Sequence, residues 1–206
     1  MKFQQLAWLS AVVVLGGIAA VGFQGGGDKF GIVDVEKVFN DSSFAKTQTD
    51  SLRTMGEARQ KVLQFVATNR TITEAQATKF KDLSLKANVS ATEQAEIDRI
   101  KSDVRTSEQK FSALSTKPNP TAQEKAEFEE LNKRRDASDA MLTTWQQSFM
   151  TEVEDRRASL RGEALEKVRQ AIAKVAREQG CTVVFDSQVA PYAANNLTDA
   201  AVKAMN

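Results

Sequence analysis

Apolar side chains recur at intervals of three, four and seven residues along most of the chain. Three such series stand out: Leu52, Met55, Val62 and Val66; Ile97, Ile100, Val104, Phe111 and Leu114; and Leu165, Val168, Ile172 and Val175. Narrow stripes of this kind, flanked by charged residues, are typical of helices that bury one seam against one partner helix. The pattern therefore predicts long paired helices rather than helices gathered around a globular core.

Helix start and stop signals divide this helical region. Capping boxes, in which Ser or Thr is followed three residues later by Glu or Gln, begin at Thr73, Ser90 and Thr121. The segment KPNP at 117–120 is a turn that no helix crosses. Gly180 is a stop signal at the end of the last long helix.

The lengths of these segments indicate how the helices pair. We expect residues 92–115 to fold back onto 122–147, residues 44–70 to pair with 150–178, and residues 72–90 to form an inserted short helix or kink. The predicted architecture is a long antiparallel helical hairpin, a coiled-coil tentacle over 44–179, with its tip near 117–120.

The segments on either side of the tentacle predict a small sheet. KFGIVDV at 29–35 and CTVVF at 181–185 each carry a β-favouring apolar run. VAPYA at 189–193 predicts a third, weaker strand at an edge because it contains Pro191, and Thr198 is expected to cap a short last helix. The fold class is therefore α+β and mostly α, with a β head formed by 30–43 and 180–206.

So small a head does not easily bury a core by itself, and we expect several subunits to share one. The residues predicted to build this oligomerisation head are Ile32, Val33, Val183, Val184, Phe185 and Tyr192.

The first 22 residues are typical of a secretory signal peptide. Lys2 precedes a 16-residue apolar run from Leu6 to Val21, and small residues follow. An uncleaved N-terminal anchor is the alternative interpretation. Residues 23–29 are expected to form a flexible, glycine-rich tether, which lacks the Lys-Ser/Thr of a phosphate-binding loop.

Composition excludes much familiar chemistry. The 206 residues contain no histidine, so a Ser-His-Asp or Cys-His nucleophile system cannot be built. The single Cys181 rules out an internal disulfide framework, and we expect it to be a small apolar filler. The 28 basic and 27 acidic residues nearly cancel, so net charge supports neither nucleic-acid binding nor contact with a membrane surface. We predict a protein without catalytic activity, metal or cofactor.

Two carboxylates are the remaining candidates for an enzyme site. Asp34 and Asp186 each follow an apolar strand run and could meet at one sheet edge, as in a hydrolase or metal site. Residues in such positions more often cap turns or helices, which is the interpretation that we favour.

The two ends of the chain resemble the OmpH/Skp family of periplasmic chaperones. The resemblance rests on an export signal followed by FGIVDVEKVFNDSSFAK, and on the closing block VAREQGCTVVFDSQVAPYAANNLTDAAVKAMN. It implies a homotrimer whose strands form a central body, from which helical tentacles enclose unfolded outer-membrane proteins in the periplasm. It implies a holdase without an active site or a nucleotide requirement. The alternative function is a structural coiled-coil scaffold or adaptor of the cell envelope.

The mechanism requires binding alone. Enclosure keeps the apolar strand segments of an unfolded barrel precursor from pairing with other chains, and many weak contacts on several arms add up. Candidate client contacts are Phe80, Leu83, Phe128, Trp145 and Phe149, although each could instead complete the packing of the arm itself. Basic residues that could hold anionic clients or lipid headgroups, or simply form a solvated face, are Lys79, Lys81, Arg134 and Arg135.

Overall fold

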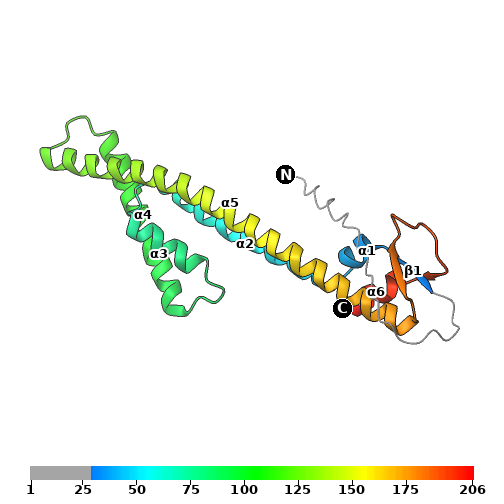
Figure 1. The fold of residues 1–206 in the computed structure, drawn as a ribbon. Coiled ribbons are helices and arrows are strands. Elements are labelled where there is room, and N and C mark those ends of the chain that lie inside the picture. The colour runs from blue at the N-terminus through cyan, green and yellow to red at the C-terminus, as the bar shows by residue number, and fades with distance from the viewer. Residues whose placement is uncertain (1–28) are drawn as a thin grey trace. The chain divides into compact units, whose positions relative to one another are not determined.

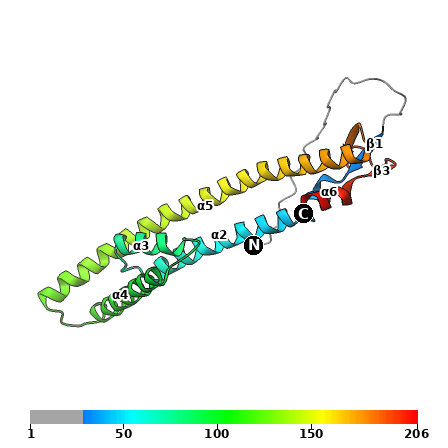
Figure 2. The ribbon, with the colours of Figure 1, turned by 90° about the horizontal axis from the view of Figure 1, so that it is seen from below.

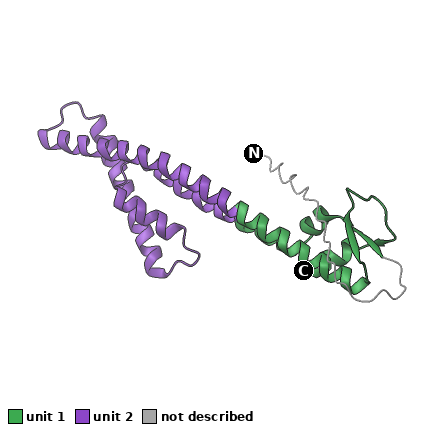
Figure 3. Ribbon diagram, viewed as in Figure 1, with its two compact units in different colours: residues 1–51, 157–206 green, residues 52–156 purple. Residues whose placement is uncertain are grey.

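The computed structural model describes residues 29–206. The predicted signal peptide and the tether up to residue 28 lie outside the described residues. The described chain forms two compact units, coloured separately in Figure 3. Unit 1 contains residues 29–51 and 157–206, and unit 2 contains residues 52–156. Two helices, α2 (Ser43–Thr68) and α5 (Ala122–Gln179), contribute residues to both units.

Unit 1 contains a small parallel sheet (Figure 1). Its strands are β1 (Phe30–Val33), β2 (Val183–Asp186) and β3 (Asn195–Asn196), in the spatial order β2-β1-β3. β1 pairs in parallel with both neighbours, with Val33 opposite Asp186 and Ile32 opposite Asn196. β1 lies within the predicted range 29–35, whereas β2 lies in the predicted range 181–185 except for its last residue, Asp186.

The third strand was predicted in the wrong place. The segment 189–193 is not a strand, because the backbone N–H groups of Val189 and Ala190 both donate to the carbonyl of Asp186 and close a turn there. Pro191 then has no N–H to offer a neighbouring strand. Pairing with β1 is made further along by β3, and Leu197 N donates to the carbonyl of Ile32 at 2.8 Å.

Two short helices and the end of α5 complete the apolar core of unit 1. These helices are α1 (Val35–Asn40) and α6 (Thr198–Met205). The buried cluster contains Val33, Val35, Val38, Val168, Ile172, Val175, Ala176, Val184, Leu197 and Ala201, and the partly buried Cys181 packs against it. The expected role of Cys181 as a small filler is confirmed.

The start of α6 differs from the prediction that Thr198 caps it. Leu197 occupies the N-cap position, and its apolar side chain makes no cap bond. Oδ1 of Asn196 accepts a hydrogen bond from the backbone N–H of Thr198 at 3.0 Å. The Thr198 hydroxyl instead accepts a hydrogen bond from the backbone N–H of Asp34, at 2.9 Å. The side chain of Asn206 is also used, since its Oδ1 accepts from the backbone N–H of Ser43 at the start of α2.

Unit 2 contains α3 (Glu74–Ser84) and α4 (Ala91–Ser115) together with its parts of α2 and α5. α2 and α5 lie side by side in Figures 1 and 2, and an ion pair between Arg59 and Glu152 at 2.6 Å joins them. α3 confirms the prediction of a short helix within 72–90.

The predicted pairing of 92–115 with 122–147 is only partly right. Near the turn at 117–120, Phe111 stacks on Phe128 with ring centroids 5.2 Å apart, and Lys117 pairs with Glu124 at 2.6 Å. The first part of α4 instead packs against α3, and in Figure 1 these two segments form a short branch. The reason is that α2 already contacts α5 from residue 139 to residue 152.

The predicted helix signals are confirmed in detail. Thr73 and Ser90 form complete capping boxes with Gln76 and Glu93. Thr121 exchanges the same two bonds with Glu124. Gly180 adopts φ +68°, the left-handed conformation that glycine adopts most readily at a helix end. Among residues 29–206, no helix has the length and apolar character needed to span a bilayer.

Candidate functional site

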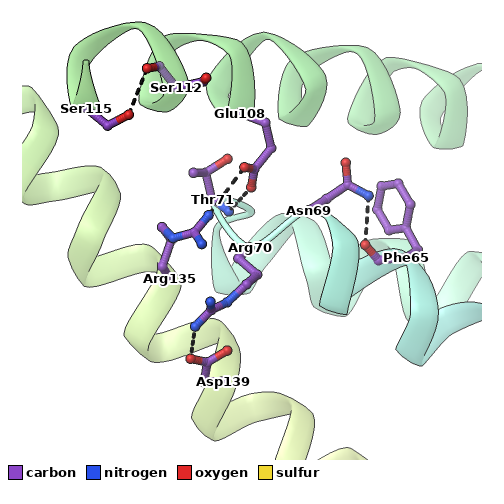
Figure 4. Close-up of polar contacts among 9 residues, drawn as sticks. All are labelled: Phe65, Asn69, Arg70, Thr71, Glu108, Ser112, Ser115, Arg135 and Asp139. Carbon is purple, nitrogen blue, oxygen red and sulfur yellow. Dashed lines mark hydrogen bonds and ion pairs between the residues drawn. The ribbon is translucent and has the colours of Figure 1, made fainter. Parts of the chain in front are cut away.

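A group of polar contacts in unit 2 lies where the chain leaves α2 (Figure 4). α2 ends here because Asn69 bonds back to the last turn: its Nδ2 donates to the carbonyl of Phe65 at 2.7 Å. The short segment 69–73 then turns the chain into α3, which starts at the Thr73 capping box. We call residues 69–73, with the side chains that bond them, the junction.

Two acidic side chains hold the junction in place. Oε1 of Glu108, on α4, accepts a hydrogen bond from the backbone N–H of Thr71 at 2.6 Å. Its other oxygen faces Arg135 of α5 at 3.4 Å. Arg70 makes an ion pair with Asp139 of α5. The junction is therefore tied to α4 and to α5 at once.

Buried polar atoms without a partner lie in the junction and on the neighbouring part of α5. Among the described residues, buried side-chain nitrogen or oxygen atoms without a hydrogen-bond partner are Arg70 Nε, Thr71 Oγ1 and Ser138 Oγ. Thr71 and Ser138 are each only 1% exposed. A buried hydroxyl without a partner costs about 1–3 kcal/mol, so the junction is a locally unfavourable part of a well-packed unit.

An open groove of about 370 Å³ adjoins the junction. Its lining residues are Ile72, Glu74, Ala137, Ser138, Ala140, Met141, Thr144 and Trp145. The ammonium group of Lys81 lies 4.8 Å from the centre of the Trp145 ring, and the centre of the Phe149 ring lies 6.4 Å from that of Trp145. The groove thus combines one aromatic wall with hydroxyl and carboxylate groups.

The predicted contact residues differ in their accessibility. Phe80, Leu83 and Phe149 are buried in the apolar cluster of unit 2. Phe128 is half-buried against Phe111, and Trp145 is half-buried in the groove wall. Of the five, Trp145 is the one that lines an open groove. The structure therefore gives the three buried residues a packing role within the chain.

The predicted basic residues divide in a similar way. Lys79 is exposed, whereas Lys81 stacks on Trp145. Arg134 makes an exposed ion pair with Glu130, and Arg135 stacks on the ring of Phe111 at 4.3 Å in addition to its contact with Glu108. Arg135 thus helps to hold the Glu108 carboxylate at the junction.

The predicted head residues are partly buried in unit 1. Ile32, Val33 and Val184 belong to its buried apolar set, whereas Val183 and Phe185 are half-buried. Tyr192 is 86% exposed. Phe30, which the prediction left out, stacks on Phe185 at 6.2 Å and is still 48% exposed, and Val189 is 60% exposed. Unit 1 therefore presents large apolar side chains to solvent.

The two carboxylates considered for catalysis have local structural roles. Asp34 accepts a hydrogen bond from Lys37 N at 2.8 Å and caps α1. Asp186 accepts from Gln188 N at 2.9 Å within the turn after β2. The interpretation of both residues as caps is confirmed. Among residues 29–206, no group of three or more acidic or cysteine side chains is placed to hold a metal ion.

Comparison with known protein families gives a match. The model of a protein family described as outer membrane protein (OmpH-like) matches residues 63–205, which is more than half of the chain. No curated protein and no solved structure matches this chain.

Proposed function

The chain belongs to the OmpH/Skp family of periplasmic chaperones, and on that premise we propose that it is an ATP-independent holdase for unfolded outer-membrane proteins. The family match over residues 63–205 is the observation that carries this proposal. The matched range includes most of unit 2 and the β2–α6 part of unit 1.

The features of the described residues are compatible with binding rather than catalysis. The two best-placed carboxylates, Asp34 and Asp186, are engaged in capping. Paired helices offer long, accessible faces to a partner without forming a closed active site. A holdase needs only such faces, because it prevents unfolded strands from meeting one another and leaves their bonds unchanged.

We further propose that unit 1 assembles into a homotrimer. Its support is the exposure of Phe30, Val189 and Tyr192, three large side chains on a unit whose sheet has only three short strands. Contiguous exposed apolar groups mark sites of association in soluble proteins. In a trimer, three chains would bind one client together, and their weak contacts would combine into useful avidity.

Two measurements on the purified mature chain test the proposal. Sedimentation equilibrium should give three times the chain mass, and Tyr192→Asp should shift the protein towards the monomer, whereas Gln188→Asp on the neighbouring turn should not. Light scattering should show that the wild type keeps a urea-diluted outer-membrane protein from aggregating without ATP. Stoichiometric binding of one folded envelope partner, with no protection of unfolded barrels, would favour the scaffold function instead.

A further inference from the structure

A segment of α5 in unit 2 is free of charged side chains. Ten of the 18 residues of α5 before Ala140 are charged, and so are 13 of the 28 residues after Thr151. None of the twelve residues from Ala140 to Thr151 is charged. In a helix that is otherwise half charged, this interruption marks a stretch with a different role.

The facing part of α2 has the same character. Between Arg59 and Arg70, Lys61 is the single charged residue of ten. An ion pair between α2 and α5 closes each end of the region: Arg59 with Glu152 at one end and Arg70 with Asp139 at the other. We call residues 60–69 and 140–151 the neutral band.

Burial within the chain does not explain the neutral band. A charge-free seam is expected where a helix is covered, yet Phe149 is the one fully buried residue between Ala140 and Thr151. The exposed residues of this segment are Ala140, Thr143, Thr144, Gln146, Gln147, Ser148, Met150 and Thr151. Met150 alone is 55% exposed, which makes it one of the most exposed large apolar side chains of the described chain. The surface is accessible, uncharged and able to form hydrogen bonds.

The groove beside the junction opens onto this band. Ala140, Met141, Thr144 and Trp145 belong to both. Ser138, one helical turn before Met141, also lines the groove. Its buried hydroxyl has no partner among the described residues. An aromatic wall, a flexible methionine and an unused hydroxyl are suited to hold an apolar side chain together with a nearby backbone amide.

We propose that the neutral band is the client-docking surface of unit 2, where an extended, uncharged client segment lies along α5 with one apolar side chain in the groove beside Trp145. The proposal rests on the holdase function and specifies which part of a client is bound. Strands of an outer-membrane barrel alternate apolar and polar residues and carry an uncharged lipid-facing row, so they match this surface in charge. A charged segment would lose water along the charge-free face of 140–151, where α5 offers it no ionic partner.

The dimensions fit a short segment. Twelve helical residues span about 18 Å, which is the length of five or six residues of extended chain. The probe is therefore a fluorescent six-residue peptide in which three aliphatic or aromatic residues alternate with Ser, Thr and Gln. A second peptide has Lys at the three polar positions and a third has Asp there.

The test uses the full mature chain and measures peptide affinity by fluorescence anisotropy. The variant Thr144→Lys with Met150→Lys places two charges on the band at exposed positions. The matched control, Gln123→Lys with Ala126→Lys, adds the same charge to exposed positions in the charged part of α5. We expect the band variant to bind the neutral peptide at least tenfold more weakly than the control. The variant Thr144→Glu with Met150→Glu should weaken binding of the neutral peptide as well. The wild type should prefer the neutral peptide to both charged peptides.

Equal affinities of the band variant and the control, in a wild type that still prevents aggregation, would overturn this proposal and leave the holdase function standing. If lysine at positions 144 and 150 weakened peptide binding and glutamate there strengthened it, net charge would govern binding, and the proposal would also be overturned. A lower assembled mass of the band variant with unchanged peptide affinity would assign the band to contacts between copies of the chain. Failure of the wild type to prevent aggregation at all would instead refute the holdase function.

Discussion

The carboxylate of Glu108 accepts a hydrogen bond from the backbone N–H of Thr71, at 2.6 Å and across 37 residues of sequence. The segment between these two residues contains α3 and most of α4, so this one contact closes the whole branch of unit 2 onto the end of α2. Glu108 also faces Arg135, which positions its carboxylate. Glu108 therefore adds a polar tie between the branch and the end of α2 to the apolar cluster that packs Phe80 and Ile97 against Val66.

Replacing Glu108 by Ala should destabilise the protein by about 2 kcal/mol, because the Thr71 N–H loses a charged acceptor. Glu108→Gln keeps an acceptor oxygen and should cost about half as much. Urea denaturation followed by circular dichroism measures both. Glu129→Ala, at an exposed position of α5, is the control and should leave the denaturation midpoint in place. A Glu108→Ala midpoint equal to that of the control would show that the branch is held by its apolar contacts alone.

Two buried threonines should respond in opposite ways to the same substitution. Thr71→Val removes a hydroxyl that has no partner among the described residues, so stability should stay the same or rise by up to about 1 kcal/mol. Thr198→Val removes the acceptor of the Asp34 N–H and should cost about 1–2 kcal/mol. Thermal unfolding of the two variants gives the comparison. A marked loss of stability in Thr71→Val would mean that its hydroxyl is bonded in solution.

Two capping carboxylates should make the protein sensitive to acid. The Lys86 ammonium, and then the backbone and hydroxyl of Ser90, lower the pKa of Glu93 from 4.5 to about 2. Lys117 and the backbone of Thr121 lower the pKa of Glu124 to about 2 as well. A depressed pKa means that the ionised carboxylate stabilises the fold. This stabilisation is fully present above pH 4.5 and is lost as the pH falls through about 2.

The measurement is the urea midpoint at several pH values between about 6 and about 2. Wild type should lose stability over this range more steeply than the Glu93→Gln, Glu124→Gln double variant, in which both groups are neutral throughout. Carboxyl NMR titration of the folded protein should place both midpoints well below 4.5. Parallel pH profiles of the two proteins would contradict the role assigned to these caps.

Glycines at two positions should differ sharply when replaced by alanine. A Cβ at Gly31 would lie 3.1 Å from Leu197 Cδ1 and 3.3 Å from Cys181 Sγ, so Gly31→Ala should cost about 1–3 kcal/mol through overpacking. A Cβ at Gly56, inside α2, would meet nothing within 4 Å, and Gly56→Ala should stabilise by about 0.5–1 kcal/mol. Thermal midpoints of the two variants test this. Equal shifts of the thermal midpoint in the two variants would show that Leu197 can move away from β1 without loss of stability.

Local signals in the sequence predicted the helices well. The capping boxes at Thr73, Ser90 and Thr121 and the stop at Gly180 depend on neighbouring residues alone, and all four are found. The partner of α4 was harder to predict. An apolar stripe such as Ile97 and Ile100 shows that the helix packs against another element, but it does not show which one. The prediction of a strand at 189–193 was wrong. It relied on the apolar residues of this segment, whereas Val189 and Ala190 form a turn with Asp186.

The candidate site was less accessible to prediction. Trp145 was selected as an aromatic residue outside the seam, and it does line the groove. Ile72, Ser138 and Met141 were missed because they are brought together by the chain reversal at 69–73, which periodicity does not reveal. The charge-free run from Ala140 to Thr151 is a signal visible in the sequence itself, since both flanking parts of the helix are rich in charge. A count of charges along the helix is therefore enough to single out this part of α5.

The parallel pairing of β1 with β2 has a consequence for the timing of folding. Phe30 lies opposite Val183, so 153 residues must be synthesised before β1 meets its first partner. At usual elongation rates of about 5–20 residues per second, this delay is roughly 8–30 s. α3 and α4 are complete well before then, while the apolar residues of β1 remain unpaired. A nascent chain therefore passes through an interval in which it is itself prone to aggregation.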